Sequence, residues 1–177
     1  MAPKLLMDVI RRQAGTLAKA VMEGVMNSVD AKATKCQITL DSTKLVITDN
    51  GSGIESKDQI EKWFETFGSE HTAEEGKVYG TFRMGRGQLF AYGANKWRTG
   101  PFQMLIDVNK LGLDYRLESN LSKLKGCNIS IELYAELSPS DLAQTLTLLR
   151  KWLKYAPIPI ELNGQNITED PKADKWT

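Results

Sequence analysis

The sequence predicts an α+β fold in which a mixed sheet is covered by helices on one face. Hydrophobic residues make up 41% and charged residues 25% of the 177 positions, which is typical of one globular domain. Long helical patterns stand beside groups of short strand patterns without strict β-α alternation. Such a distribution favours a layer of helices packed on a sheet over a doubly wound fold.

The first half of the chain begins with helical periodicity. Apolar residues recur every three or four positions, and a glycine interrupts them at Gly15. Alternating segments and a cluster of turn-forming residues follow. The expected elements are a short and a long helix within 5–33, strands over 35–40 and 45–48, a turn over 49–53, a helix over 57–67 and a polar loop over 68–78.

The second half ends in a strong helix signal. In the segment Ser-Pro-Ser-Asp at 138–141, either serine can cap a helix and the proline suits its first position. We expect this helix to continue to about Tyr155. The other expected elements are a helix over 88–94, strands over 102–109, 113–118 and 128–133, and a last strand near Ile160 that leads into a turn at 163–164.

Charge and cysteine content exclude several protein classes. The formal net charge is +1, so charge alone predicts neither nucleic acid nor membrane as a partner. No apolar run approaches the roughly 18 residues of a membrane span, and the first ten residues lead us to expect no secretory signal. Cys36 and Cys127 form no C-x-x-C pair, and His71 is the only histidine, which argues against a zinc site. Two free thiols favour a reducing, cytoplasmic location.

Three polar residues share one face of the predicted long helix. Glu23, Asn27 and Asp30 follow one another at spacings of four and three residues. A buried carboxylate beside an amide needs a compensating partner, and a hydrated Mg²⁺ ion, which prefers oxygen ligands, would be one. Asn27 would then bind the metal, and Glu23 would polarise a water molecule. A solvent-exposed polar stripe is the alternative interpretation.

Two glycine-rich segments follow this helix. The segment 49–53 (Asp-Asn-Gly-Ser-Gly) comes directly after a predicted strand, so its backbone can approach a flat ligand and Asp49 can accept a hydrogen bond from an exocyclic amine. The segment 80–87 (Gly-Thr-Phe-Arg-Met-Gly-Arg-Gly) precedes a predicted helix, whose N-terminus favours a phosphate. An ordinary turn and a flexible loop are the respective alternatives.

The order of these motifs closely resembles that of the GHKL superfamily of ATPases, which includes Hsp90, MutL, type II topoisomerases, MORC proteins and sensor histidine kinases. Glu-x-x-x-Asn-x-x-Asp-Ala on a helix is followed by Asp-x-Gly-x-Gly, a glycine-rich loop and a strand led by Gly126. The resemblance extends over 17–167. It implies the Bergerat fold, a two-layer α/β sandwich with a mixed, mostly antiparallel sheet.

The resemblance implies that the polar helix face and the first glycine-rich turn bind ATP and Mg²⁺. Asn27 would bind Mg²⁺, Glu23 would activate the attacking water as general base, and Asp30 would support the site through hydrogen bonds. Asp49 would bind the adenine amino group. Close backbone approach would be provided by Gly51 and Gly53.

The lid and the adenine side depart from the family pattern in two places. Cys127 stands where the family has a threonine, and a thiol is a poorer hydrogen-bonding group than a hydroxyl. Arg83 stands where many members have a glycine. The lid and the phosphate-binding turn would comprise Gly80, Arg83, Gly85, Arg86 and Gly87.

An organisation and an activity also follow from the resemblance. We expect an ATPase domain over 1–168, with 1–16 as a helical segment exchanged in a dimer, and a polar tail over 169–177. The expected function is slow, Mg²⁺-dependent ATP hydrolysis in which the nucleotide closes a lid and promotes a homodimer. A downstream domain or partner protein would supply a catalytic lysine unless Lys151 or Lys154 does so. The alternatives are an ATP-gated protein-interaction switch with little or no hydrolysis, and a non-binding domain whose site has decayed.

Overall fold

The computed structural model describes residues 5, 8–10, 12, 15–60, 85–112 and 114–172. In these ranges the strands are β1 (Cys36–Leu40), β2 (Lys44–Asp49), β3 (Gly93–Gly100), β4 (Phe102–Ile106), β5 (Tyr115–Glu118), β6 (Leu124–Leu133), β7 (Ile160–Leu162) and β8 (Gln165–Asn166). The principal helices are α2 (Leu17–Asp30), α5 (Gly85–Phe90) and α6 (Pro139–Trp152). No helix in the described ranges combines the length and apolar character needed to cross a membrane.

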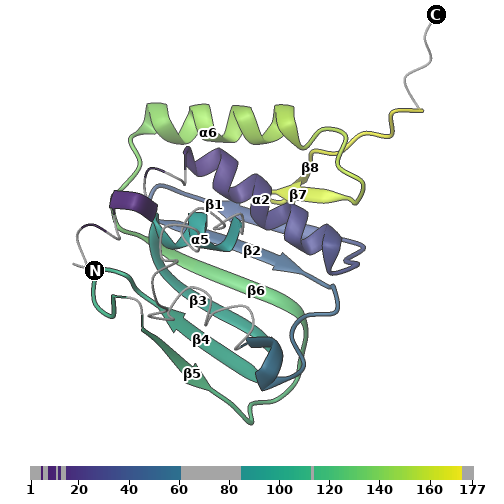
Figure 1. The fold of residues 1–177 in the computed structure, drawn as a ribbon. Coiled ribbons are helices and arrows are strands. Elements are labelled where there is room, and N and C mark those ends of the chain that lie inside the picture. Colours follow the sequence, from purple (N-terminus) through teal and green to yellow (C-terminus); the bar gives the residue numbers. More distant parts are fainter. Residues whose placement is uncertain are drawn as a thin grey trace, which may run out of the picture.

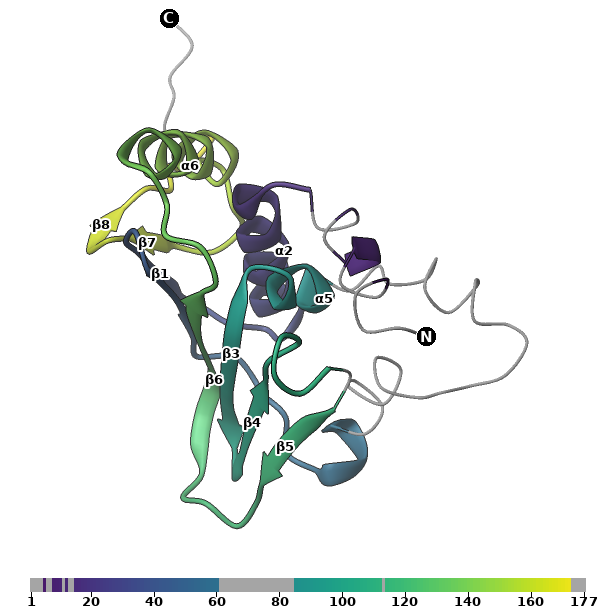
Figure 2. The ribbon, with the colours of Figure 1, turned by 90° about the vertical axis from the view of Figure 1, so that its left-hand side faces the viewer.

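The strands form one mixed sheet in the order β5-β4-β3-β6-β2-β1-β7-β8 (Figure 1). Neighbouring strands are antiparallel except β1 and β7, which run parallel. Helix α2 packs against both α5 and α6, and the three helices lie together over the sheet (Figure 2). The predicted α+β class, with helices on one face of a mostly antiparallel sheet, is therefore confirmed.

The core lies between the helices and the sheet, and it includes the strand side chains that point toward the helices. In β1, Cys36, Ile38 and Leu40 are buried, whereas the alternate residues are exposed. Helix α2 adds its own apolar side, including Val21 and Val25, which have no exposed surface. This alternation on the strands and helical periodicity on α2 are the two patterns that a two-layer core requires.

Helix α2 begins where the sequence indicates a break. Gly15 has a φ of 66°, a left-handed conformation that suits glycine. The hydroxyl of Thr16 then caps the helix by accepting a hydrogen bond from the Lys19 N–H at 3.2 Å. The predicted division into two helical segments near 15–16 agrees with this geometry.

Helix α6 begins with the predicted serine-proline signal. Ser138 is the cap, because its hydroxyl accepts a hydrogen bond from the Asp141 N–H at 3.1 Å, and Pro139 is the first helical residue. The helix ends at Trp152, slightly before the expected Tyr155. Few residues of α6 are buried, and the helix packs beside α2.

The expected helix over 88–94 is wrong at its C-terminal end. Helix α5 ends at Phe90, and the chain enters β3 at Gly93, a strand that the sequence analysis missed. Glycines bound this strand at both ends, and Lys96 and Arg98 interrupt its apolar content. A glycine is needed at 93 because a Cβ there would lie 2.2 Å from the carbonyl oxygen of Glu132.

The other expected elements agree more closely with the structure. The strand expected over 102–109 stops at Ile106, because Asp107 begins a turn by accepting hydrogen bonds from two following N–H groups. β8 was not anticipated. Of the helix expected over 57–67, the described part is helical at 57–60, and the rest lies outside the described residues, as does the expected loop over 68–78.

Candidate functional site

Four side chains form one row across neighbouring strands on the helix-facing side of the sheet. Asp49 on β2 pairs with β1 on one side and with β6 on the other, and β6 pairs in turn with β3. The register places in this row Cys36, Asp49, Cys127 and Thr99. The next row toward the middle of the sheet is apolar and consists of Ile38, Ile47, Ile129 and Trp97.

Two hydrogen bonds fix the Asp49 carboxylate. Ser28 on α2 donates its hydroxyl to Oδ2 at 2.8 Å, and the Gly51 N–H donates to Oδ1 at 2.8 Å. A carboxylate offers about four lone-pair positions, so both oxygens can still accept another donor. Because the residue is only partly buried, that donor can come from a bound molecule.

The turn after β2 is attached to β3 through Thr99. This fully buried hydroxyl accepts the Ile54 N–H at 2.8 Å and donates to the carbonyl of Gly126 at 2.9 Å. Gly53 has a φ of 65°, and a Cβ there would lie 2.6 Å from both Thr99 Oγ1 and the Gly126 oxygen. The turn can therefore lie this close to β3 and β6 only with glycine at 53.

A second contact attaches the turn to the end of α2. The Ser52 N–H donates to the carbonyl of Ala31 at 2.8 Å. A Cβ on Gly51 would lie 2.7 Å from that same oxygen. Gly51 thus serves close packing against α2, and its predicted contact with a ligand stays a prediction.

Two adjoining hollows lie between this turn, α2 and the sheet. The inner one, of about 50 Å³, has an apolar wall that includes Ile54, Trp97 and Ile129, and polar groups at Asn27, Ser28, Asp49, Thr99 and Cys127. The outer one, of about 290 Å³, shares Asn27, Ala31, Gly53 and Ile54 with the first and adds Asp30, Ser52 and Gln59. An apolar wall with a few fixed polar groups is the usual composition of a small-molecule site.

Asn27 has an unused hydrogen-bonding group in this site. Its Nδ2 is buried and has no hydrogen-bond partner among the described residues, a costly condition that a bound acceptor would relieve. The carbonyl oxygen of the same amide is a hard ligand of the type that Mg²⁺ prefers. The residue therefore fits a site for a phosphate with its metal ion.

The structure brings together some of the predicted site residues. Asn27, Asp30, Asp49, Gly53 and Cys127 line the two hollows. Glu23 is half-buried one helical turn before Asn27, and it is not among the described residues that line either hollow.

The glycine-rich segment is described only in part. Gly85 begins α5 and Gly87 lies within it, and α5 packs against α2. The side chain of Arg86 and the residues Gly80 and Arg83 lie outside the description. Their predicted phosphate contacts stay predictions.

Neither cysteine takes part in a disulfide bond, and the two flank Asp49 on opposite sides. Strands lie about 4.8 Å apart, so the α-carbons of Cys36 and Cys127 are separated by two strand spacings, beyond the reach of a disulfide. Burial raises the pKa of Cys36 to about 12, and the negative charge of Asp49 acts in the same direction, whereas the hydrogen bond to Ser28 acts against them. Cys36 is therefore a neutral thiol.

The sequence analysis missed two residues that shape the site, Ser28 and Thr99. Ser28 lies beside Asn27, and a small hydroxyl residue next to a polar helical face is a weak signal that could have indicated it. Thr99 gave no signal, because its strand was itself missed.

The two lysines expected as possible catalytic groups are Lys151, within α6, and Lys154, shortly after it. Lys154 Nζ pairs with Glu169 at 3.1 Å and lies 5.1 Å from the ring centre of Tyr155. Lys151 is exposed on α6. Neither residue lines a hollow described here.

Residues 15–95 match the family model described as histidine kinase-, DNA gyrase B-, and HSP90-like ATPase. The predicted resemblance to GHKL-type ATPases is thereby confirmed for this segment. The fold is similar to the N-terminal domain of a DNA repair protein, with a TM-score of 0.58, 20% identity, and coverage of 90% of this chain and 55% of that chain. It is also similar to the Aquifex aeolicus MutL ATPase domain complexed with ADP, with a TM-score of 0.51, 18% identity, and coverage of 85% and 61%.

The likeness to these structures supports the predicted Bergerat-type arrangement of sheet and helices. The chain spans less than two thirds of either structure. A comparison with curated protein sequences finds no significant match.

Proposed function

Because residues 15–95 match the model of histidine kinase-, DNA gyrase B- and HSP90-like ATPases, we propose that the protein binds ATP in the two hollows beside Asp49. The observation that carries this proposal is the Asp49 carboxylate, which Ser28 and Gly51 hold at an apolar cavity. Its free lone pairs suit the amino group of adenine. The ADP found in the MutL domain of similar fold also supports the proposal.

The remaining polar groups would act on the triphosphate end. Asn27 would hold Mg²⁺ and a phosphate oxygen with its unpaired amide, and Asp30 would support that end through the outer hollow. Bound Mg²⁺ would neutralise phosphate charge. Backbone N–H groups at the start of α5, with the loop from Gly80 that includes Arg83 and Arg86, would bind phosphate.

Titration calorimetry with ATP and Mg²⁺ tests the binding step. The variant Asp49→Asn keeps the size of the side chain but presents an amide where the carboxylate accepts hydrogen bonds, so we expect at least a roughly tenfold loss of affinity. Asp114→Asn, an equal change at an exposed site, should bind as the wild type does. Wild-type affinity in Asp49→Asn would contradict the proposal.

We also propose that Glu23 acts as the general base of ATP hydrolysis. In this role its carboxylate takes a proton from the attacking water. Glu23→Gln should then retain ATP binding while losing turnover, measured as phosphate release. Glu136→Gln, at an exposed position, is the matched control.

An ATP-gated interaction switch with little hydrolysis is the second candidate function. The position of Glu23 outside the described lining of both hollows favours it. In that case, wild type and Glu23→Gln would bind ATP equally and release phosphate at the same negligible rate. A clear difference in turnover between them would exclude the switch in this form.

We further propose that ATP closes a lid and promotes a homodimer through 1–16. The ATPase domain would extend over 1–168, followed by a polar tail over 169–177. A downstream domain or partner would supply the lysine for the γ-phosphate, since Lys154 is paired with Glu169. Two cysteines that form no disulfide bond support a cytoplasmic location. Light scattering should show the dimer with a non-hydrolysable ATP analogue, and a monomer with every analogue would contradict it.

A further inference from the structure

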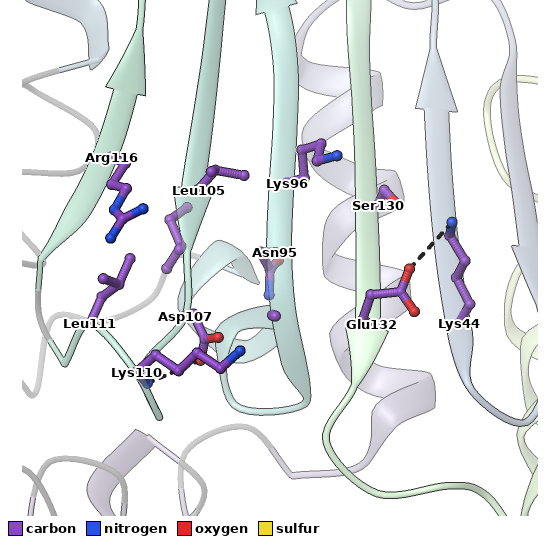
Figure 3. Close-up of a pocket in the computed structure, with 12 residues that line it drawn as sticks. Lys44, Asn95, Lys96, Leu105, Asp107, Lys110, Leu111, Arg116, Ser130 and Glu132 are labelled. Atoms are coloured by element: carbon purple, nitrogen blue, oxygen red, sulfur yellow. Dashed lines mark hydrogen bonds and ion pairs between the residues drawn. The ribbon is translucent and has the colours of Figure 1, made fainter.

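Another hollow, of about 430 Å³, lies on the face of the sheet that points away from the helices (Figure 3). Its lining comes from β2 to β6 and from the turn between β4 and β5. On these strands the helix-facing residues Ile47, Trp97 and Ile129 belong to the core, and the alternate residues point outward. This hollow is therefore separate from the candidate ATP site, and the inference from it goes beyond the proposed function.

Two small residues create the depression. Ala94 on β3 and Ser130 on β6 lie at outward-facing positions in its lining. Ala94 pairs with Glu132, and Ser130 pairs with Lys96, so long side chains stand beside the short ones on the neighbouring strands. The result is a depression with a charged rim, and its volume falls within the range of about 300–1,000 Å³ that is usual for ligand pockets.

Positive charge on this rim exceeds negative charge. The lining contains four basic side chains but only two acidic ones. Lys44 is paired with Glu132 at 3.4 Å. Among the described residues, no carboxylate pairs with the side chains of Lys96, Lys110 or Arg116.

The other acidic side chain of the lining, Asp107, already accepts hydrogen bonds from neutral donors. Asp107 accepts the Tyr134 hydroxyl at 2.8 Å and the backbone N–H groups of Asn109 and Lys110 at 3.1 and 3.2 Å. Figure 3 shows the Lys110 side chain at one end of the hollow, close to Asp107, with Arg116 toward one side and the Lys44–Glu132 pair toward the other. The surplus cations thus surround one space.

The floor between the cations is apolar. Leu105 on β4 pairs with Arg116 on β5 and with Lys96 on β3, so the three residues form one row with the leucine in the middle. Since strands lie about 4.8 Å apart, the two charged residues start from backbones about 10 Å apart. Leu111 adds to the apolar lining. A guanidinium group favours phosphate and carboxylate because it can donate two parallel hydrogen bonds.

We propose that this hollow binds a small organic dianion, a compact molecule with two phosphate, sulfonate or carboxylate groups on an apolar or aromatic body. Its charged groups bind Arg116 and the two lysines, and its body lies on Leu105 above Ala94. Charge complementarity and the apolar floor together define this class of ligand, because isolated surface charges contribute little to binding.

Calorimetry with naphthalene-1,5-disulfonate at low salt tests the proposal. We expect saturable binding of one molecule per chain. Arg116→Met should weaken it by roughly tenfold, and Ala94→Leu, which fills the hollow without changing the charge, should abolish it. Lys151→Met removes one positive charge from an exposed position on α6 and should bind as the wild type does.

Circular dichroism and thermal unfolding verify the fold of each variant. Disulfonate binding is measured independently of ATP binding, so a failure of this proposal can be distinguished from a failure of the proposed function. Undiminished binding by folded Ala94→Leu would overturn the proposal, as would an equal loss in Lys151→Met or no binding by the folded wild type. Pyrophosphate binding as tight as that of the disulfonate would exclude the role of the apolar floor. The proposal would also be overturned if an oligothymidylate bound more tightly than the disulfonate and lost affinity equally in Arg116→Met and Ala94→Leu. The ligand would then be a nucleic-acid strand.

Discussion

Thr99 on β3 and Gly126 on β6 are joined by a hydrogen bond of 2.9 Å from the threonine hydroxyl to the glycine carbonyl. The same hydroxyl accepts the N–H of Ile54 at 2.8 Å, and the Thr99 side chain is fully buried. One oxygen atom therefore connects two strands with the turn that follows Asp49. Because water cannot replace either bond, the position of that turn depends on this hydroxyl.

Replacement of Thr99 by valine should destabilise the protein. Thr99→Val keeps the shape but leaves a buried N–H and a buried carbonyl without partners, so we expect a loss of roughly 2–4 kcal/mol in the free energy of unfolding. Thr99→Ser keeps the hydroxyl and should lose about 1 kcal/mol for the missing methyl group. Urea denaturation measures both. Equal stability of the two variants would show that the hydroxyl has no structural role.

Replacement of Gly53 by alanine should lower the free energy of unfolding more than the same change at Gly164. Both glycines have a positive φ, of 65° and 83°, so alanine is strained by about 1–2 kcal/mol at each position. At 164 no atom of the described residues lies within 4 Å of the new Cβ, whereas at 53 two oxygen atoms lie 2.6 Å away. We expect Gly53→Ala to lose at least about 2 kcal/mol more, together with ATP affinity. Equal losses in urea denaturation would contradict the described packing.

Alkaline pH should destabilise the protein through Cys36. Burial raises the pKa of its thiol from the ordinary value of 9.0 to about 12 in the folded state. Above pH 9 the unfolded chain loses this proton and the folded chain keeps it, so this contribution to stability is complete below pH 9 and is lost as the pH rises toward 12. Through this one thiol, the free energy of unfolding falls by at most about 1.4 kcal/mol for each pH unit.

The comparison of wild type with Cys36→Ala isolates this contribution. Both proteins contain the tyrosines, which also titrate at high pH, so only the difference between their slopes reports on the thiol. Urea denaturation at pH 8 and 10.5 measures it, and the variant should show the shallower decline. Parallel declines would mean that the thiol ionises equally in both states.

Bound ATP should protect Cys127 from alkylation. This thiol is half-buried in the lining of the inner hollow, where we place adenine, whereas Cys36 has no exposed surface. Mass spectrometry after brief exposure to iodoacetamide should therefore show slower labelling of Cys127 with ATP and Mg²⁺ than without them. Cys36, unlabelled in both samples, is the internal control. Identical labelling of Cys127 would place the nucleotide elsewhere.

The fold was predictable from the sequence where periodicity and caps agree. The break at Gly15 before α2 and the serine-proline start of α6 were both predicted, and β1 shows strict alternation of buried and exposed residues. β3 was missed because the contacts that determine this strand come from residues that are distant in the sequence. Gly93 is required by the carbonyl of Glu132 on β6, a contact that no short sequence window contains.

The candidate site was predictable to a similar extent. Asn27 and Asp49 are recognisable by their chemistry and spacing, and the structure places both beside the inner hollow. Ser28 and Thr99 were missed, since each acts by holding another group rather than by presenting unusual chemistry of its own. Such supporting roles depend on the register between strands, which cannot be deduced from local sequence patterns.

The parallel pairing of β1 with β7 has a consequence for synthesis on the ribosome. Cys36 pairs with Ile160, and Asn163 uses both ends of its amide to bind the backbone of Leu40. The outer edge of β1 consequently lacks this partner until the last part of the domain has left the exit tunnel. A nascent chain halted before Ile160 would expose that edge to other chains, a condition that invites aggregation and chaperone capture.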